Sequence, residues 1–139
     1  MKNIFIVLLA GIMGISASCQ LKVTEAAKKA FATMFPNATN LKWDKESADE
    51  YEANFKLNGV AVSANFKHDG TWVETETTIK TTELPDAVTN AINSKYPGAS
   101  YTHAERIEKP GGKILYEAII KVNGKKKEME LNADGSFAE

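Results

Sequence analysis

Residues able to do covalent, acid–base or metal chemistry are scarce in this sequence of 139 residues. His68 and His103 are the only histidines, and Cys19 is the only cysteine. Nucleophilic catalysis needs a histidine beside a nucleophile and a third group that orients it, and no serine here has nucleophile-elbow spacing. Neither histidine has neighbours at the spacing of a zinc site. We therefore expect both histidines on the surface, and we predict no catalytic residue, metal or cofactor.

Paired carboxylates are the next candidates. Glu74 and Glu76 stand two apart in a predicted strand, so both project from the same face. Such a pair can serve acid–base catalysis or bind calcium. The Asp-Gly pairs at 69–70 and 134–135 lack the other ligands of a calcium loop, and hairpin turns explain them. The pattern favours a solubilising stripe of carboxylates beside lysines.

Two aromatic residues, Trp72 and Phe137, are the strongest candidates for a binding surface. If the Asp-Gly pair at 69–70 is a two-residue hairpin loop, Trp72 pairs with Lys67 and lies on the uncovered face of the sheet, as does Phe137. Exposed aromatics framed by charges are typical of protein-binding hot spots. A longer turn would reverse the alternation and send both rings into the core. The candidate binding residues are Trp72, Phe137, Lys67, Lys56, Glu52 and Glu74.

These residues belong to a unit that occurs twice. The stretch KHDGTWVE (67–74) recurs as NADGSFAE (132–139), and YEANFKLNG (51–59) recurs as YEAIIKVNG (116–124). The sequence therefore predicts a duplicated unit, with one copy over 23–78 and the other over 84–139, joined by the polar segment 78–83.

Each unit reads as a helix followed by four strands. Apolar residues recur at helical steps over 23–34 and 84–96, and Pro36 and Pro97 end both helices. Period-two alternation and Asn-Gly or Asp-Gly turns then predict antiparallel strands with one wet face. We expect an α+β fold in which one antiparallel sheet carries both helices on the same face.

The first nineteen residues read as a secretory signal peptide, which leaves 20–139 as one domain. A basic Lys2 precedes an apolar run that is too short to span a bilayer, and small residues follow it. Cys19 stands at the expected cleavage point. It is a candidate for lipidation, the alternatives being ordinary cleavage beside it or a free thiol.

Charge excludes another class of partner. The formal net charge is −1, so we expect neither nucleic-acid binding nor a broad attraction to anionic membranes. The basic run GKKKEME (124–130) is followed at once by glutamates and reads as a solvated strand whose lysines discourage edge pairing.

The motifs together resemble the PepSY-like, beta-lactamase-inhibitor-like proteins of the Gram-negative cell envelope. The matching features are FPNA (35–38), YPGA (96–99), the helix start LPDAV (84–88), Trp43, and the Asn-Gly and Asp-Gly hairpins. The resemblance covers about 21–139. It implies a tandem helix-plus-four-strand architecture, export to the periplasm, and a role in binding or inhibiting another protein. It supplies no catalytic residues.

We therefore expect an exported, non-enzymatic protein that binds a protein or peptide on its uncovered sheet face. The predicted location is the periplasm, where a lipid on Cys19 would be the only contact with the outer membrane. A small-ligand-binding or structural envelope module is the alternative, and an enzyme is the least favoured class.

Overall fold

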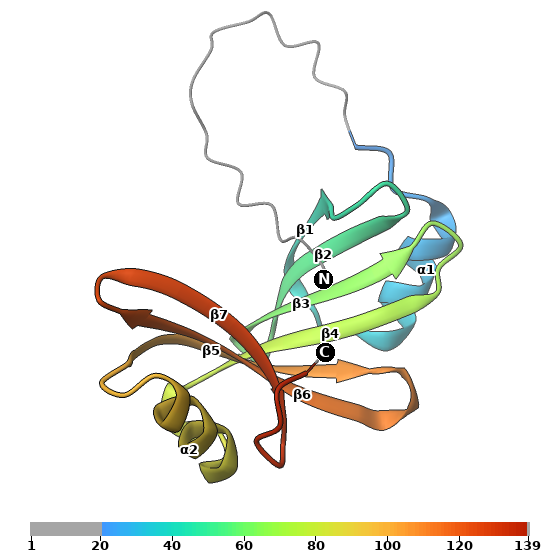
Figure 1. Ribbon diagram of the computed structural model, residues 1–139. Helices are drawn as coiled ribbons and strands as arrows, with labels where there is room; N and C mark the ends of the chain where they lie inside the picture. Colours follow the sequence, from blue (N-terminus) through green and yellow to red (C-terminus); the bar gives the residue numbers. More distant parts are fainter. Residues whose placement is uncertain (1–20, 139) are drawn as a thin grey trace, which may run out of the picture.

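The computed structural model describes residues 21–138 (Figure 1), so the predicted signal peptide and Cys19 lie outside the described residues. Two α-helices, two short 3₁₀ helices and seven strands follow in chain order. They are α1 (Glu25–Met34), β1 (Thr39–Lys45), β2 (Glu50–Leu57), β3 (Val60–Lys67), β4 (Trp72–Ile79), η1 (Thr81–Glu83), α2 (Asp86–Lys95), β5 (Ser100–Lys109), η2 (Pro110–Gly112), β6 (Lys113–Val122) and β7 (Lys125–Asn132).

All seven strands form one antiparallel sheet in the order of the chain, from β1 to β7. This confirms the predicted α+β fold with a single antiparallel sheet. The two units differ at the end of the chain, because the fourth strand expected in the second unit is reduced to an isolated bridge between Leu131 and Phe137. The other strands predicted for the two units are present as β1 to β7.

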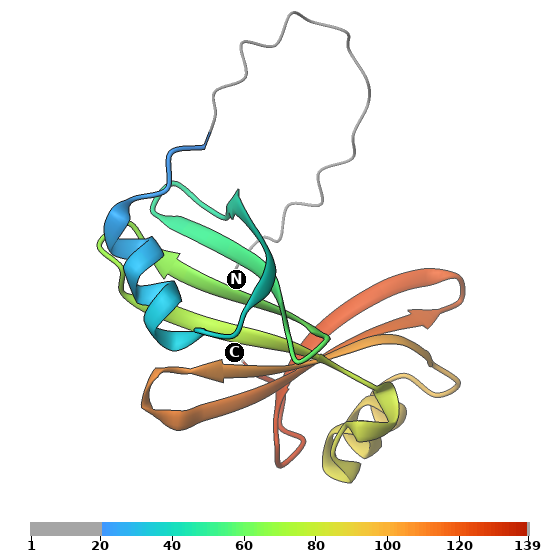
Figure 2. The ribbon, with the colours of Figure 1, turned by 180° about the vertical axis from the view of Figure 1, so that it is seen from behind.

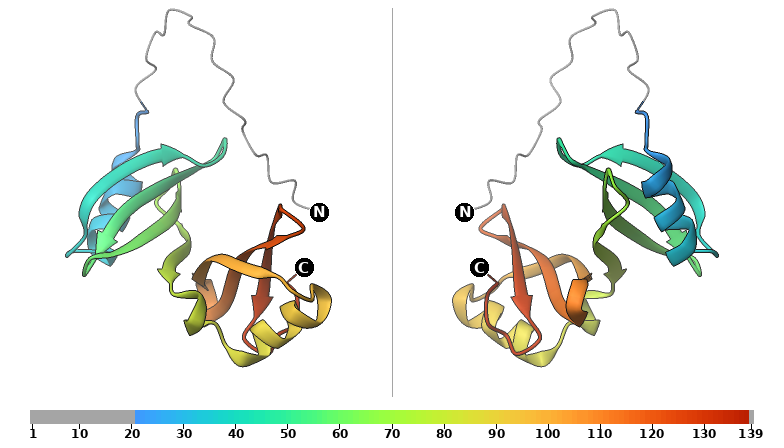
Figure 3. Two further views of the ribbon diagram at one scale, coloured as in Figure 1. Left: turned by 90° about the vertical axis from the view of Figure 1, so that its left-hand side faces the viewer. Right: turned by 90° about the vertical axis from the view of Figure 1, so that its right-hand side faces the viewer.

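Both helices cover the same face of the sheet. Ala53 and Ala64 pair across β2 and β3 in the core under α1, while Ala104 and Ala118 pair across β5 and β6 under α2. The register through β4, where Ile79 pairs with Ala104, places all of these side chains on one side. The views in Figures 2 and 3 show the sheet strongly twisted, with each helix against its own half. We call the opposite side of the sheet the open face.

The two halves have chemically different cores. Under α1 the Phe31 ring meets Phe55 at 5.0 Å between centroids and Trp43 at 5.5 Å, both edge-on. Under α2 the core is aliphatic, built on the fully buried Ile92 and Leu131. Each fully buried side chain of this size contributes roughly 1.5–3 kcal/mol, so packing alone can hold both halves.

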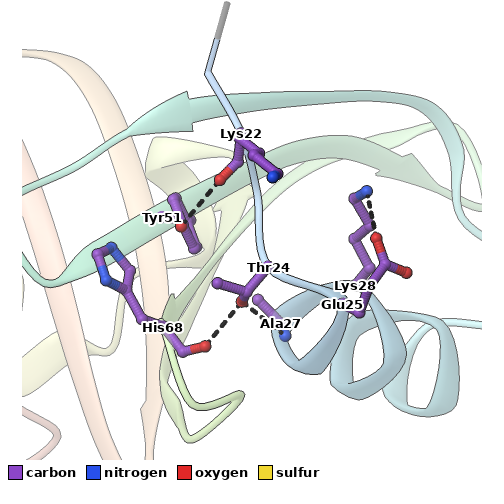
Figure 4. Close-up of polar contacts among 7 residues, drawn as sticks. All are labelled: Lys22, Thr24, Glu25, Ala27, Lys28, Tyr51 and His68. Atoms are coloured by element: carbon purple, nitrogen blue, oxygen red, sulfur yellow. Dashed lines mark hydrogen bonds and ion pairs between the residues drawn. The ribbon is translucent and has the colours of Figure 1, made fainter.

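The start of α1 is fixed to the β3–β4 hairpin (Figure 4). The Thr24 hydroxyl accepts a hydrogen bond from the Ala27 amide at 3.3 Å and donates one to the His68 carbonyl at 2.7 Å. Tyr51 adds a second tie, since its hydroxyl donates to the Lys22 carbonyl at 3.1 Å and its ring stacks on His68 at 4.5 Å. The N-cap therefore holds the helix to the sheet as well as satisfying its first amides.

The hairpin turns are of two kinds. The Asn-Gly pairs at 58–59 and 123–124 have positive φ at both residues, as a two-residue type I′ turn requires, so these predictions are confirmed. The Asp-Gly turns differ from the predicted two-residue loops. Lys67 donates its amide to the Thr71 carbonyl and accepts from the Gly70 amide, which makes a three-residue loop whose glycine is left-handed, with φ +88°. The same two bonds recur in the second unit, where the Asn132 amide donates to the Ser136 carbonyl and the Asn132 carbonyl accepts from the Gly135 amide.

Candidate functional site: the open face of the sheet

Trp72 does not lie on the open face. The longer loop places Trp72 opposite Phe66, whose side chain is in the core under α1, and a register shift follows between Asn65 and Phe66. Trp72 packs against that core, and its Nε1 donates to the Thr75 hydroxyl at 2.9 Å. The placement predicted from a two-residue loop is therefore wrong, because the extra loop residue moves Trp72 to the other side of the sheet, and the bulge after it returns Glu74 to the open face.

Phe137 is also on the helix side. It bridges to Leu131, which belongs to the core under α2. Its ring lies 4.0 Å below the ammonium of Lys95 at the end of that helix. The side chain is 36% exposed, so it forms an edge of the covered face. The prediction of an open-face Phe137 is wrong for the same reason, while a binding role for either ring stays a prediction.

The charged candidates do lie on the open face. Alternation along β2, β3 and β4 from the core residues puts Glu52, Lys56, Lys67 and Glu74 there. The structure brings Glu52 and Glu74 together, because both are paired directly with Asn65 between them. We call Glu52, Asn65 and Glu74 the amide row. Lys56 and Lys67 lie toward opposite ends of the same strands.

Hydrogen bonds order the amide row. The Asn65 amide nitrogen donates to Glu74 Oε1 at 3.3 Å, and the Lys109 ammonium pairs with Glu74 Oε2 at 2.7 Å. Asn54 donates to Glu52 Oε2 at 3.0 Å. Asn65 itself is only 7% exposed.

A second row of acidic residues crosses the other half. Glu105 pairs directly with Glu117, and Glu117 pairs directly with Glu130. We call these three residues the acidic ladder. Sequence reasoning did not single them out, yet a signal was present: in the duplicated unit Glu117 occupies the position of Glu52, and Glu130 that of Asn65. Both units therefore carry polar rows at equivalent positions.

Burial and mutual repulsion raise the pKa of Glu117 to about 8. Burial is the larger cause, followed by the negative charges of Glu128, Glu105, Glu76 and Glu130. Like charges directly opposite one another destabilise a sheet. The acidic ladder therefore lowers the stability of the sheet.

Glu76 links the two rows. Its pKa is raised to about 7, chiefly by burial and then by the charges of Glu105 and Glu74, while a hydrogen bond from the Ser63 hydroxyl at 3.0 Å opposes the shift. It pairs across the strands with Ile107, which is fully buried although it lies on the open face. The prediction of Glu74 and Glu76 on one face is correct, and Glu76 is partly desolvated there rather than freely solvated.

A hollow of about 410 Å³ lies on the open face over the first half of the sheet. Its lining includes the carboxylates of Glu52, Glu76 and Glu105 and the side chains of Lys42 and Lys56. Its lining brings together carboxylates of both halves, since Glu105 comes from β5.

A larger hollow, of about 570 Å³, lies at the end of the first half. Its walls include Trp43, Tyr51 and His68, together with Leu21 and Ala48. The Trp43 and Tyr51 rings meet edge-on at 6.3 Å between centroids. Aromatic side chains therefore characterise this hollow, whereas carboxylates characterise the hollow on the open face.

The remaining predicted residues have simple surroundings. His68 is exposed and stacks on Tyr51, and His103 is partly exposed with its Nε2 2.9 Å from Glu105 Oε1. Within residues 21–138, no three His, Cys, Asp or Glu side chains are grouped so that they could hold a metal ion. Over the same residues, neither helix has the length and apolar character needed to cross a membrane.

Comparison with known proteins gives a family and a fold. Residues 49–138 match the model of a family described as "Putative beta-lactamase-inhibitor-like, PepSY-like". No curated protein matches the chain.

Solved structures from Bacteroides share the architecture. A BLIP-like protein of Bacteroides fragilis is 24% identical with a TM-score of 0.71, covering 86% of this chain and 85% of its own. A DUF2874 family protein of Bacteroides uniformis is 21% identical with a TM-score of 0.74, over 83% and 86% of the two chains. A Bacteroides eggerthii structure described as "putative periplasmic proteins" is 20% identical with a TM-score of 0.76, over 85% and 87%. At these identities the likeness shows the fold alone.

Proposed function

The chain belongs to the PepSY-like, beta-lactamase-inhibitor-like family, and from that premise we propose that it is an exported, non-enzymatic protein that binds a basic segment of another protein or peptide on its open face. The family description refers to likeness with inhibitors of a protein, which is in keeping with a protein partner. The acidic character of the open face supplies the chemistry of the segment.

One observation carries the proposal: the acidic ladder. Three glutamates paired side by side reduce the stability of the sheet, and burial together with the surrounding carboxylates raises the pKa of Glu117 to about 8. Natural sequences depart from local stability rules chiefly at functional sites. A cationic segment laid across the ladder would remove the repulsion and provide hydrogen-bond donors to carboxylates.

Direct titration tests this. We expect a fluorescein-labelled ten-lysine peptide to bind the protein in an anisotropy assay, and the affinity to fall as sodium chloride is raised. The triple variant Glu105→Gln, Glu117→Gln, Glu130→Gln should bind about tenfold more weakly. The matched control removes three charges on the helix side: Glu25→Gln, Asp86→Asn and Glu108→Gln. If both triple variants bound the peptide equally weakly, the loss of affinity would follow from net charge alone, and the open face would not be the binding site.

Export and anchoring form a second part of the proposal. The predicted signal peptide and the description of the Bacteroides eggerthii neighbour support a periplasmic location. A lipid on Cys19 would hold the domain at the membrane. Replacing Cys19 with Ser should move the protein from the membrane fraction to the soluble envelope fraction. Unchanged fractionation would rule out the lipid.

Small-ligand binding is a second candidate, favoured by the hollow that Trp43, Tyr51 and His68 line. Aromatic walls with polar tips suit a small, partly apolar ligand. A fragment library screened by thermal shift would reveal it. Hits should be lost in Trp43→Ala and kept in Trp72→Phe, which alters the other tryptophan. If the same fragments still bound Trp43→Ala, the hollow would not be their binding site.

A further inference from the structure

We propose that Asn65 anchors a guanidinium group, so that an arginine of the bound segment inserts between Glu52 and Glu74 in the amide row. This inference rests on the proposed function, because it gives the basic segment one specific residue and one specific place.

The first observation is an orphaned acceptor. Asn65 is 7% exposed, and its Oδ1 is buried with no hydrogen-bond donor among the described residues. The orientation of the amide is fixed by chemistry, because Glu74 Oε1 can only accept and so must face the amide nitrogen of Asn65. A buried acceptor without a donor destabilises a fold and needs an explanation.

The side chain cannot turn away to find a donor. Ala64 and Phe66, on either side of Asn65 in β3, both belong to the core under α1 and are almost completely buried. Alternation then holds Asn65 on the open face. Any donor must therefore reach Oδ1 from that side.

The neighbours of Asn65 are acceptors too. Glu52 and Glu74 are its direct cross-strand partners. Glu46 lies in the same field: its pKa is raised, first by burial and then by the charges of Glu52, Glu50 and Glu74. The surroundings therefore offer several oxygen atoms and an excess of negative charge.

Two lysines offset part of that charge. Lys109 is committed to Glu74 at 2.7 Å, and Lys67 is paired across the strands with Glu50. Among the described residues, Glu52 has no ion-pair partner. The Oδ1 of Asn65 and the carboxylate of Glu52 therefore both remain open to one incoming cation.

A guanidinium fits this arrangement better than an ammonium. Its five donors lie in one plane, so it can donate to Oδ1 and to a carboxylate on the adjacent strand at the same time. An ammonium presents its donors from a single point.

The second unit has Glu130 where the first has Asn65, so the amide distinguishes this row from the acidic ladder.

The test follows the Asn65 side-chain amide by NMR in ¹⁵N-labelled protein. N-acetyl-arginine methylamide should shift these signals in a saturable way. The citrulline analogue, which has nearly the same shape but no charge, should leave them fixed, and the lysine analogue should bind at least about threefold more weakly than the arginine probe. An equal response to arginine and citrulline, or unmoved Asn65 signals, would overturn the inference without any variant.

Variants give an independent readout. Asn65→Leu should weaken the arginine probe at least about fivefold, whereas Asn93→Leu, the same change on α2, should not. If the ten-lysine peptide binds through the ladder while Asn65→Leu leaves arginine binding intact, the anchor is wrong and the proposed function stands. If the ten-lysine peptide fails to bind and the arginine probe still shifts Asn65, the anchor stands and the proposed function fails.

Discussion

Gly135 lies against the main-chain carbonyl of Ala87, so closely that a Cβ on the glycine would stand 2.5 Å from that oxygen. The first unit repeats the relationship, with Gly70 against Ala26 and a corresponding distance of 2.8 Å. In both units, therefore, the hairpin after the third strand seats the first turn of the helix. The duplication extends beyond sequence to this helix–hairpin contact.

The first prediction concerns that contact. Gly135→Ala should lower the free energy of unfolding by about 3 kcal/mol, because it combines a left-handed φ of +87° with a main-chain clash. Gly124→Ala is the matched control: its φ is +76° but nothing lies within 4 Å of the added carbon, so it should lose only about 1 kcal/mol. Urea denaturation of both measures the difference. Equal losses would mean that the helix can move aside freely.

The second prediction concerns pH. The pKa of Glu117 is raised to about 8 from 4.5, and that of Glu76 to about 7. The folded protein therefore binds these protons more tightly than the unfolded chain, so their contribution to stability is complete below about pH 4.5 and is lost as the pH rises through about 7 to 8. We expect the melting temperature to fall between about pH 5.5 and about pH 9.

Glu117→Gln isolates the effect. In this variant the melting temperature should depend much less on pH, and at about pH 9 it should be higher than that of the wild type. Glu25→Gln, on the surface of α1, should show the same fall of melting temperature with pH as the wild type. A wild-type melting temperature that rises over this range would contradict the raised pKa values of Glu117 and Glu76.

The third prediction concerns the cap of α1. Thr24→Ala should destabilise the protein by about 1 kcal/mol, since it removes the bonds of the hydroxyl to the Ala27 amide and to the His68 carbonyl. Thr24→Ser retains the hydroxyl and should recover most of the loss. Hydrogen exchange should show faster opening in the first turn of α1 and in the hairpin at 67–71 together. Faster exchange in the helix alone would mean that Thr24 does not couple the two.

Much of the fold could be read from the sequence because local signals and the duplication agreed. Alternation along 51–57 and 60–66, with Asn58-Gly59 between them, fixed both the strands and their pairing. The helix ends followed from Pro36 and Pro97. The position of Trp72 could not be read in the same way, because one extra residue in the 68–70 loop moves Trp72 to the helix side, and the bulge that follows it returns Glu74 and Glu76 to the predicted face.

The open face was harder to foresee. Glu52 and Glu74 could be found because they lie on β2 and β4, which short local hairpins join to β3 between them. The acidic ladder depends on the pairing of β5 with β6 and β7, and its link to Glu76 depends on β4 pairing with β5 across the whole of α2. Non-local register of this kind has no short-range signal. The orphaned Oδ1 of Asn65 is a property of packing and is invisible in the sequence.

The last prediction follows from the corrected position of Trp72. Trp72→Ala should destabilise the protein by about 3 kcal/mol, since the ring packs against the core under α1 and its Nε1 donates to Thr75. Trp72→Phe keeps an aromatic ring in the core but loses that hydrogen bond and part of the ring volume, so it should cost less, about 1–2 kcal/mol. Both variants should bind the ten-lysine peptide as tightly as the wild type at a temperature where each is folded. A loss of binding in Trp72→Phe with unchanged stability would place the ring at the binding surface after all, because a core-side tryptophan can affect a ligand on the opposite face only by disturbing the sheet between them.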